Sequence, residues 1–212
     1  MLNIPQMEPS FGDEERDALS AYLNQDPSPW LTEFDKTREL ETMIAGYVGS
    51  KHCFMTPNAT LALYAMLMVC DIGPGDEVII PDFTMVATAN AVRMTGATVR
   101  FVDVKADTWC MDLDKAWKII NSKTRAILPV HINGRSIHMV AATALAQSND
   151  IVLLEDAAQA LGSTWNGKHL GTFGLMGAYS FSSQKIVSTG NGGCVVTDDD
   201  DIAERLRMFR DF

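Results

Sequence analysis

Lys185 stands in a stretch of small polar residues, SFSSQKIVSTGNGG, at residues 180–193. The stretch contains no carboxylate that could pair with the amine, and it continues directly from a run typical of a β-strand. A lysine at a strand end without a local acid loses part of its solvation, which lowers its pKa and leaves a nucleophilic amine. The alternative interpretation is an ordinary surface lysine, which is the commoner case for a single residue.

Asp156 is a second candidate, and it stands two positions after four consecutive apolar residues in IVLLEDAAQALG, at residues 151–162. This places the carboxylate at the C-terminal edge of a buried strand, where open α/β sheets form their ligand crevice. Gln159 follows three residues later, on the same side of the turn. The alternative is that Asp156 caps a short helix. Glu155 alternates to the opposite face of the strand and is interpreted as structural.

A third feature is the junction at residues 52–67, HCFMTPNATLALYAML, where a strand passes through PNAT into an apolar helix. The N–H groups of Ala59 and Thr60, with the Thr60 hydroxyl, would point toward an anion. By itself the junction favours the alternative that Asn58 simply caps this helix. Taken together, the three features match the three parts of pyridoxal phosphate. The anion site would contact the phosphate, the strand-end aspartate would pair with the pyridine nitrogen, and the strand-end lysine would supply an amine for the aldehyde.

Seven short runs rich in β-branched or aromatic residues predict the strands that position these side chains. Several runs are apolar at consecutive positions, and most are separated by helical patterns such as residues 84–95 and 112–120. We therefore expect an α/β fold with a mostly parallel seven-stranded sheet and helices on both faces. The runs cover residues 52–56, 77–81, 98–104, 125–131, 151–157, 177–183 and 192–198.

Two amphipathic helical patterns, residues 13–24 and 33–48, precede the first strand. The sequence QDPSPW at residues 25–30 separates them, because its prolines and serine favour an extended loop. We expect residues 1–32 to form an N-terminal arm with a helix, and residues 33–212 to form one large domain.

The composition excludes several classes of protein. The net charge of -10, from 17 Lys+Arg against 27 Asp+Glu, provides no attraction for nucleic acid. No apolar run reaches the roughly 18 to 20 residues of a membrane helix, and we expect a cytoplasmic protein. The 4 cysteines show no CxxC spacing, which favours reduced thiols. The run DDDD at residues 198–201 is interpreted as a helix N-terminus, and no metal site is expected.

Six longer segments cover nearly all of the chain: GDEVIIPDFTMVATANAV, GATVRFVDV, TRAILPVHINGR, LLEDAAQALGS, GTFGLMGAYSFSSQK and TGNGGCVVTDD. In type, order and approximate spacing they resemble the DegT/DnrJ family of sugar-nucleotide aminotransferases. The resemblance implies the large domain of the fold type I pyridoxal-phosphate enzymes. It also implies pyridoxal 5′-phosphate as cofactor and a homodimer with shared active sites.

The resemblance assigns a role to each candidate residue. Lys185 would form the Schiff base with the cofactor and move the proton between the cofactor and the sugar carbon. Asp156 would keep the pyridine nitrogen protonated, and Gln159 would lie near the ring hydroxyl. Since the dehydratase branch of the family has histidine in place of this lysine, Lys185 favours transamination. The residues implied in cofactor binding are Asn58, Ala59, Thr60, Met85, Asp156, Gln159, Ser180 and Lys185.

The implied reaction moves an amino group from glutamate to a keto carbon of a nucleotide-linked deoxysugar, in two half-reactions. The segments VHINGR and TMVATANAV resemble the perosamine-type branch, which acts on a 4-keto-6-deoxy sugar. On the substrate side, His131 is a candidate contact or else a hydrogen-bonded structural histidine. Arg135 is a candidate phosphate contact or else part of a surface salt bridge. Asn191 is a third candidate.

The chain departs from the family pattern in three respects. Met85 occupies a position where the family usually has an aromatic ring over the cofactor. Asn191 stands where glutamate is common. Family members also continue into a small C-terminal domain, so we expect this chain to retain most cofactor contacts with an incomplete substrate pocket. The alternative function is a non-catalytic module that binds pyridoxal phosphate and serves as a sensor or partner subunit.

Overall fold

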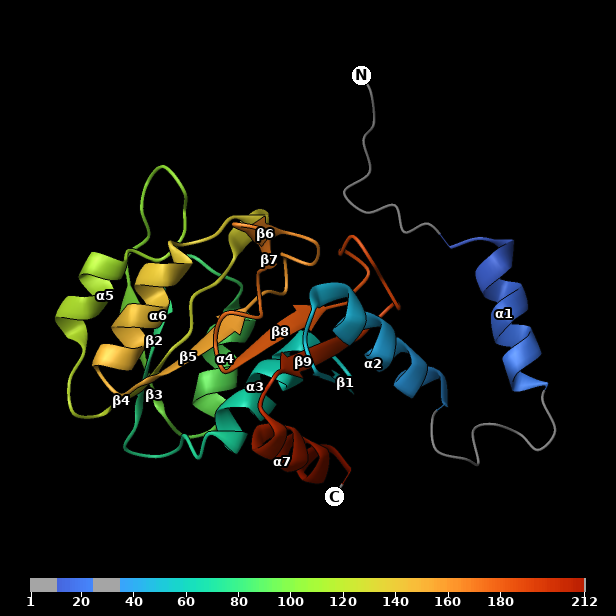
Figure 1. Ribbon diagram of the computed structural model, residues 1–212, viewed down its shortest axis with the longest axis horizontal. Helices are drawn as coiled ribbons and strands as arrows, with labels where there is room; N and C mark the ends of the chain where they lie inside the picture. The colour runs from blue at the N-terminus through green and yellow to red at the C-terminus, as the bar shows by residue number, and fades with distance from the viewer. Residues whose placement is uncertain (1–10, 25–34, 212) are drawn as a thin grey trace.

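A central sheet organises the protein, whose computed structural model describes residues 11–24 and 35–211 (Figure 1). Its strands are β1 (His52–Thr56), β2 (Glu77–Pro81), β3 (Thr98–Val102), β4 (Thr124–Ile127), β5 (Val152–Asp156), β8 (Met176–Ser180) and β9 (Gly193–Thr197). They lie in the order β1-β9-β8-β5-β4-β2-β3. Only β9 runs antiparallel to its neighbours, β1 and β8. The predicted α/β fold with a mostly parallel seven-stranded sheet is confirmed.

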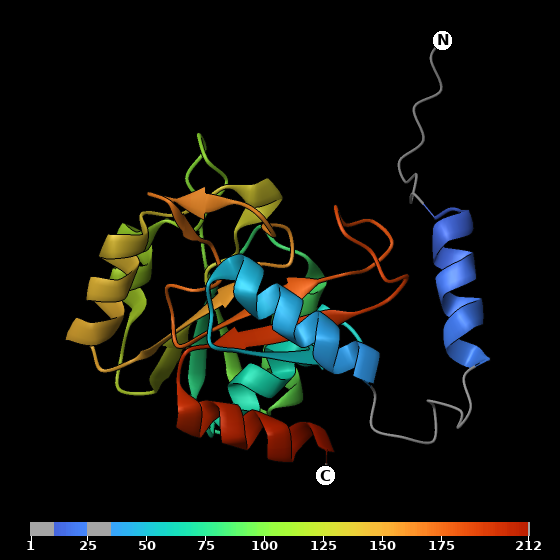
Figure 2. The same cartoon turned by 45° about the vertical axis from the view of Figure 1, so that its right-hand side comes forward.

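Helices cover both faces of this sheet (Figures 1 and 2). The helices of the described residues are α1 (Asp13–Leu23), α2 (Asp35–Val48), α3 (Ala59–Val69), α4 (Val86–Met94), α5 (Leu113–Ile119), α6 (Met139–Ser148), α7 (Asp200–Asp211) and a short 3-10 helix, η2 (Ile132–Gly134). One hydrophobic core joins α2, α5 and α6 to the sheet, and a second joins α3, α4 and α7 to its other face. Consecutive strand residues divide between the cores, so that Leu153 belongs to the first and Leu154 to the second. This double burial explains the consecutive apolar residues of the strands.

A small hairpin, absent from the predicted elements, lies outside the central sheet. It consists of β6 (Thr164–Trp165) and β7 (Lys168–His169), which pair antiparallel. Asn166 and Gly167 form its two-residue turn with φ values of 50° and 81°. Two central residues with positive φ are typical of a type I′ hairpin turn, for which Asn-Gly is a preferred sequence.

The run DDDD forms the start of α7, as the sequence predicted. Helix α7 begins at Asp200, and the Asp199 carboxylate accepts a hydrogen bond from the backbone N–H of Ile202 at 2.9 Å. Asp200 also pairs with His52 at 2.8 Å. In residues 11–24 and 35–211, no group of three or more His, Cys, Asp or Glu side chains could hold a metal ion.

Helix α1 contains no buried residue and stands apart from the domain in both views (Figures 1 and 2). The predicted loop at residues 25–30 lies outside the described residues, and the division between residues 32 and 33 stays a prediction. Across the described part of the chain, no helix is long and apolar enough to cross a membrane. The four cysteines are free thiols.

Candidate active site

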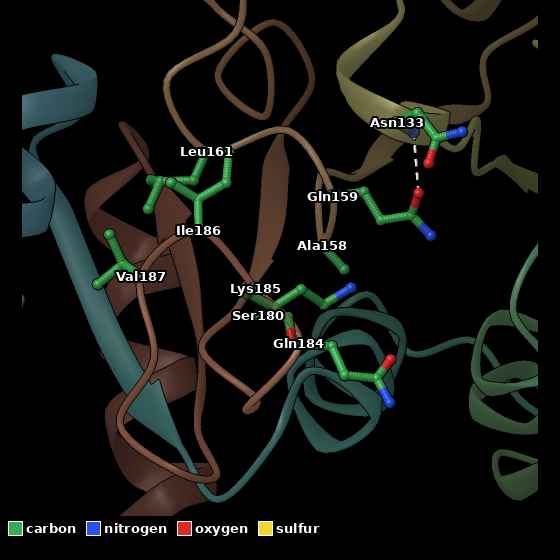
Figure 3. Close-up of a pocket in the computed structure, with 9 residues that line it drawn as sticks. All are labelled: Asn133, Ala158, Gln159, Leu161, Ser180, Gln184, Lys185, Ile186 and Val187. Carbon is green, nitrogen blue, oxygen red and sulfur yellow. Dashed lines mark hydrogen bonds between the residues drawn. The ribbon is translucent and has the colours of Figure 1, made fainter. Parts of the chain in front are cut away.

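The Lys185 side chain reaches into a pocket of about 390 Å³ at the C-terminal edge of the sheet (Figure 3). Gln159 and Ser180 line the same pocket, although they come from different segments of the chain. Burial lowers the pKa of the Lys185 amine, and the negative charge of Asp156 partly opposes this shift. The pocket therefore brings the half-buried amine of Lys185 together with two other predicted residues, Gln159 and Ser180.

Asp156 ends β5 and is almost completely buried. Its Oδ2 accepts a hydrogen bond from the Thr88 hydroxyl at 2.8 Å, and its Oδ1 accepts one from the Ala158 N–H at 3.1 Å. Burial raises the pKa of the Asp156 carboxyl, and these two donors oppose that shift. The alternative of a helix cap is not observed, because residues 157–163 form turns. Two hydrogen bonds leave the carboxylate with capacity for a further donor.

Thr88 is a site residue that the sequence analysis missed. It lies on α4, is fully buried, and its hydroxyl lies 2.8 Å from that of Thr84. A sequence signal was present, because Thr88 precedes Ala91 and Val92 by three and four residues and so shares their buried helix face. A polar residue at such a position requires a partner in the interior, and here the partner is Asp156.

The N-terminus of α3 has two backbone N–H groups, those of Ala59 and Thr60. The described residues provide no hydrogen-bond acceptor for either of them. The Asn58 side chain caps the helix instead, since its Oδ1 accepts a hydrogen bond from the Leu61 N–H at 3.0 Å. The capping alternative is therefore observed for the Asn58 side chain. The free N–H groups still provide the partial positive charge that favours an anion at a helix start.

Gly193 connects this helix start to Ser180. It pairs with Thr56 of β1 on one side and with Ser180 of β8 on the other. A Cβ atom at Gly193 would lie 2.5 Å from the Ala59 nitrogen, so only glycine lets β9 pass this close to α3. Gly193 therefore neighbours both Ser180, through the sheet, and the start of α3 at Ala59.

We expect Gly193→Ala to lower the free energy of unfolding by about 1–3 kcal/mol, because the new methyl group overpacks the start of α3. Gly46→Ala is the matched control. Gly46 is exposed on α2 with nothing within 4 Å of its added Cβ, and alanine there is expected to stabilise the protein by up to about 1 kcal/mol. Urea denaturation measures both. Equal effects of the two substitutions would contradict the close packing of β9 on α3.

Glu155 occupies the opposite face of β5 from Asp156 and is fully buried, as its interpretation as a structural residue requires. Its Oε2 lies 2.8 Å from His131 Nε2 and accepts from the Gly171 N–H at 2.8 Å. Its Oε1 accepts from the N–H groups of Phe173 and Gly174 at 2.6 and 2.7 Å. His131 is also fully buried, so the structure favours the structural alternative for this histidine.

Of the predicted site residues, Gln159, Ser180 and Lys185 line the Lys185 pocket, and the others do not. Met85, Arg135 and Asn191 are exposed or line another pocket. Met85 precedes α4 and is 64% exposed. Arg135 is exposed, and its guanidinium lies over the Trp109 ring; the alternative of a surface salt bridge is not found among the described residues. Asn191 lines a separate pocket of about 960 Å³ between α2, the end of β1 and α7.

The mostly parallel sheet, covered by helices on both faces, with a lysine and a buried aspartate at its C-terminal edge, defines the class of fold: that of the fold type I pyridoxal-phosphate enzymes. The chain belongs to the DegT/DnrJ/EryC1/StrS aminotransferase family, whose model matches residues 9–212.

Comparison with known proteins gives similar relatives. The chain is 36% identical over 214 residues to a GDP-perosamine synthase from Caulobacter vibrioides, which covers 99% of this chain and 57% of the relative. An aminotransferase from Psychrobacter cryohalolentis superposes with a TM-score of 0.91 at 35% identity, covering 97% of this chain and 52% of that one. A GDP-4-keto-6-deoxymannose-3-dehydratase with a trapped PLP-glutamate geminal diamine gives a TM-score of 0.88 at 30% identity, covering 97% and 54%.

These findings confirm the family, the fold and pyridoxal phosphate as the cofactor of the family. The chain spans only about half of the length of the relatives that it matches.

Proposed function

We propose that the protein binds pyridoxal phosphate and transfers an amino group from glutamate to the keto carbon of a nucleotide-linked 4-keto-6-deoxy sugar. One observation carries the proposal: Lys185 and Ala158 line the same pocket, and the Ala158 N–H donates to the buried carboxylate of Asp156 at 3.1 Å. The family membership supports the reaction class, and the similarity to a GDP-perosamine synthase supports the choice of sugar.

The donors at the start of α3 fit the phosphate of the cofactor. The N–H groups of Ala59 and Thr60 and the hydroxyl of Ser180 offer three hydrogen bonds to an anion beside the glycine backbone of β9. Asn58 contributes by capping the same helix.

Pyridoxal phosphate, when bound, supplies an electron sink for negative charge on the carbon next to the amino nitrogen. Lys185 would hold the aldehyde end of the cofactor and then move a proton at Nζ, because its lowered pKa leaves more of the amine neutral. Asp156 would accept a hydrogen bond from the protonated ring nitrogen. Gln159 accepts from the Asn133 N–H at 2.8 Å through Oε1, so its Nε2 is left to donate to the ring oxygen (Figure 3).

We expect Asp156→Asn to change stability and cofactor affinity in opposite directions. Burial raises the pKa of the carboxyl, so the charged form at neutral pH destabilises the fold, and the protonated form favours it at low pH. Asparagine removes this charge and keeps the contacts to Ala158 and Thr88. Its amide oxygen can accept from the Ala158 N–H, and its amide nitrogen can donate to the Thr88 hydroxyl, which then donates to Thr84. Thermal unfolding of the cofactor-free variant should therefore occur at an equal or higher temperature than that of the unchanged chain.

The same variant should bind pyridoxal phosphate roughly 10- to 100-fold more weakly, because a charge-assisted hydrogen bond to the ring nitrogen is lost. Equilibrium dialysis with the cofactor measures this change. Unchanged affinity would contradict the role of Asp156.

The proposed reaction is tested with the 212-residue chain and added pyridoxal phosphate. We expect a visible absorbance band that L-glutamate shifts to shorter wavelength and that D-glutamate leaves unchanged. Addition of GDP-4-keto-6-deoxymannose should restore the band, and mass spectrometry should detect the aminated sugar nucleotide. A band that never responds to L-glutamate would favour the alternative function, a module that binds the cofactor as a sensor or partner subunit.

We also infer that the protein forms a homodimer with shared active sites. We further infer that it is located in the cytoplasm. The exposed Met85 at the start of α4 and Asn191 in the second pocket would then meet substrate or the second subunit. Light scattering of the chain with its cofactor measures the mass in solution, and a monomeric mass would contradict the dimer.

A further inference from the structure

Two exposed aromatic rings and an arginine form a contiguous cluster that the proposed chemistry leaves unused. Phe83 and Trp109 are each 47% exposed, and their rings meet edge to face with centroids 5.3 Å apart. The Arg135 guanidinium lies 5.7 Å from the centroid of the Trp109 ring and donates to the Thr108 carbonyl at 3.5 Å. In the described part of the chain, no carboxylate forms an ion pair with Arg135. The cluster therefore combines an apolar aromatic surface with an uncompensated positive charge.

The backbone holds Trp109 in this position against its conformational preference. Trp109 has a φ of 60°, in the left-handed region that bulky residues rarely adopt. The turn is closed by hydrogen bonds from the Trp109 N–H to the Lys105 carbonyl at 2.8 Å and from the Lys105 N–H to the Cys110 carbonyl at 2.9 Å. Burial does not account for this strain, because Trp109 remains about half exposed. Such strain at an exposed side chain is typical of functional sites.

The cluster belongs to the same edge of the sheet as the Lys185 pocket. Phe83 follows the C-terminal end of β2, and the loop that carries Trp109 follows β3 and rises beyond the sheet in both views (Figures 1 and 2). Arg135 ends the turn of η2, two residues after Asn133, which lines the Lys185 pocket. One short turn thus connects the pocket to the cluster.

We propose that Phe83, Trp109 and Arg135 form the subsite for the nucleoside diphosphate part of the substrate. The rings offer a stacking surface to the nucleobase, and the guanidinium offers hydrogen bonds and charge to the diphosphate. A protein with a net charge of -10 needs such a local cation to bind a dianion. This inference rests on the proposed function, in which the sugar is linked to a nucleotide.

The test is calorimetric titration of the 212-residue chain, loaded with pyridoxal phosphate, with GDP, UDP and dTDP. We expect at least one of the three to bind. Trp109→Leu and Arg135→Met should each weaken that binding about tenfold or more. Trp117→Leu is the matched control, because Trp117 is 62% exposed on α5 and belongs to no such cluster, and it should change the affinity less than twofold.

A second variant separates binding from folding. Trp109→Gly suits the left-handed backbone, so it should weaken nucleotide binding as Trp109→Leu does without lowering Tm. Binding of none of the three nucleotides at millimolar concentration, or equal affinity in the Trp109 and Trp117 variants, would overturn the subsite. A change of oligomeric mass in Trp109→Leu without a change in nucleotide affinity would also overturn it, in favour of a subunit contact. The response to L-glutamate is recorded separately for each variant, so failure of the subsite is distinguished from failure of the amino transfer.

Discussion

Lys185→Ala is expected to abolish the visible absorbance band of the chain with pyridoxal phosphate and to lower the rate of amino transfer at least about 10²- to 10⁴-fold. The lysine supplies both the amine that holds the cofactor and the group that moves the proton, and the remaining residues of the pocket offer no second amine. Absorbance spectra and the rate of glutamate consumption measure the two effects.

Lys118→Ala is the matched control, since Lys118 is exposed on α5, and it should leave the band and the rate unchanged. A small primary amine such as methylamine should restore part of the rate of Lys185→Ala, which a loss of folding would not permit. A band that survives in Lys185→Ala would sink the assignment of this lysine.

The rate should also depend on pH through the same residue. Burial lowers the pKa of the Lys185 amine, so the neutral, proton-accepting form appears at a lower pH than in an ordinary lysine. The rate should rise as pH increases through this lowered pKa, and methylamine rescue of Lys185→Ala should move the rising limb to higher pH.

Glu155→Ala is expected to lower the free energy of unfolding by about 3–5 kcal/mol, the largest stability effect that the structure predicts. Four hydrogen bonds end on this buried carboxylate, from His131 and from the N–H groups of Gly171, Phe173 and Gly174. Removing the acceptor leaves these buried donors without a partner and opens a cavity beside β5. Urea denaturation followed by circular dichroism measures the change.

Glu155→Gln should be less destabilising, because the amide keeps one acceptor oxygen and the shape of the side chain. Glu204→Ala is the control, since Glu204 is exposed on α7, and its effect should stay within about 0.5 kcal/mol. A loss below about 1 kcal/mol in Glu155→Ala would contradict the view that this carboxylate anchors the loop at residues 171–174.

Local patterns predicted the strands of the central sheet because the burial of each strand is visible in its own apolar residues. Residues of β5 alternate between the two hydrophobic cores, and the consecutive apolar positions of IVLL are the direct consequence. The hairpin of β6 and β7 was missed because two-residue strands are too short to show a period, although the Asn166-Gly167 turn was a readable signal.

Some features of the candidate site could likewise be predicted from local sequence, and others could not. The position of Asp156 at the end of β5 follows from its neighbours in sequence, and so does the cap that Asn58 provides for α3. Lys185 lies in the loop beyond the end of β8 at Ser180, because the strand is shorter than the predicted run 177–183. The placement of Met85 and Asn191 outside the Lys185 pocket could not be predicted, because it depends on which loops meet above the sheet.

The sequence by itself predicted the strands, the edge of the sheet where the candidate site lies, and the two titratable residues, Lys185 and Asp156, that we assign to it. These properties are local, since hydrophobic period and turn chemistry act over a few residues. Only the tertiary structure decided that Thr88 donates to Asp156 and that Gly193 passes against Ala59. Each of these contacts joins residues far apart in the chain, and its geometry is set by the order β1-β9-β8-β5, which no local pattern records.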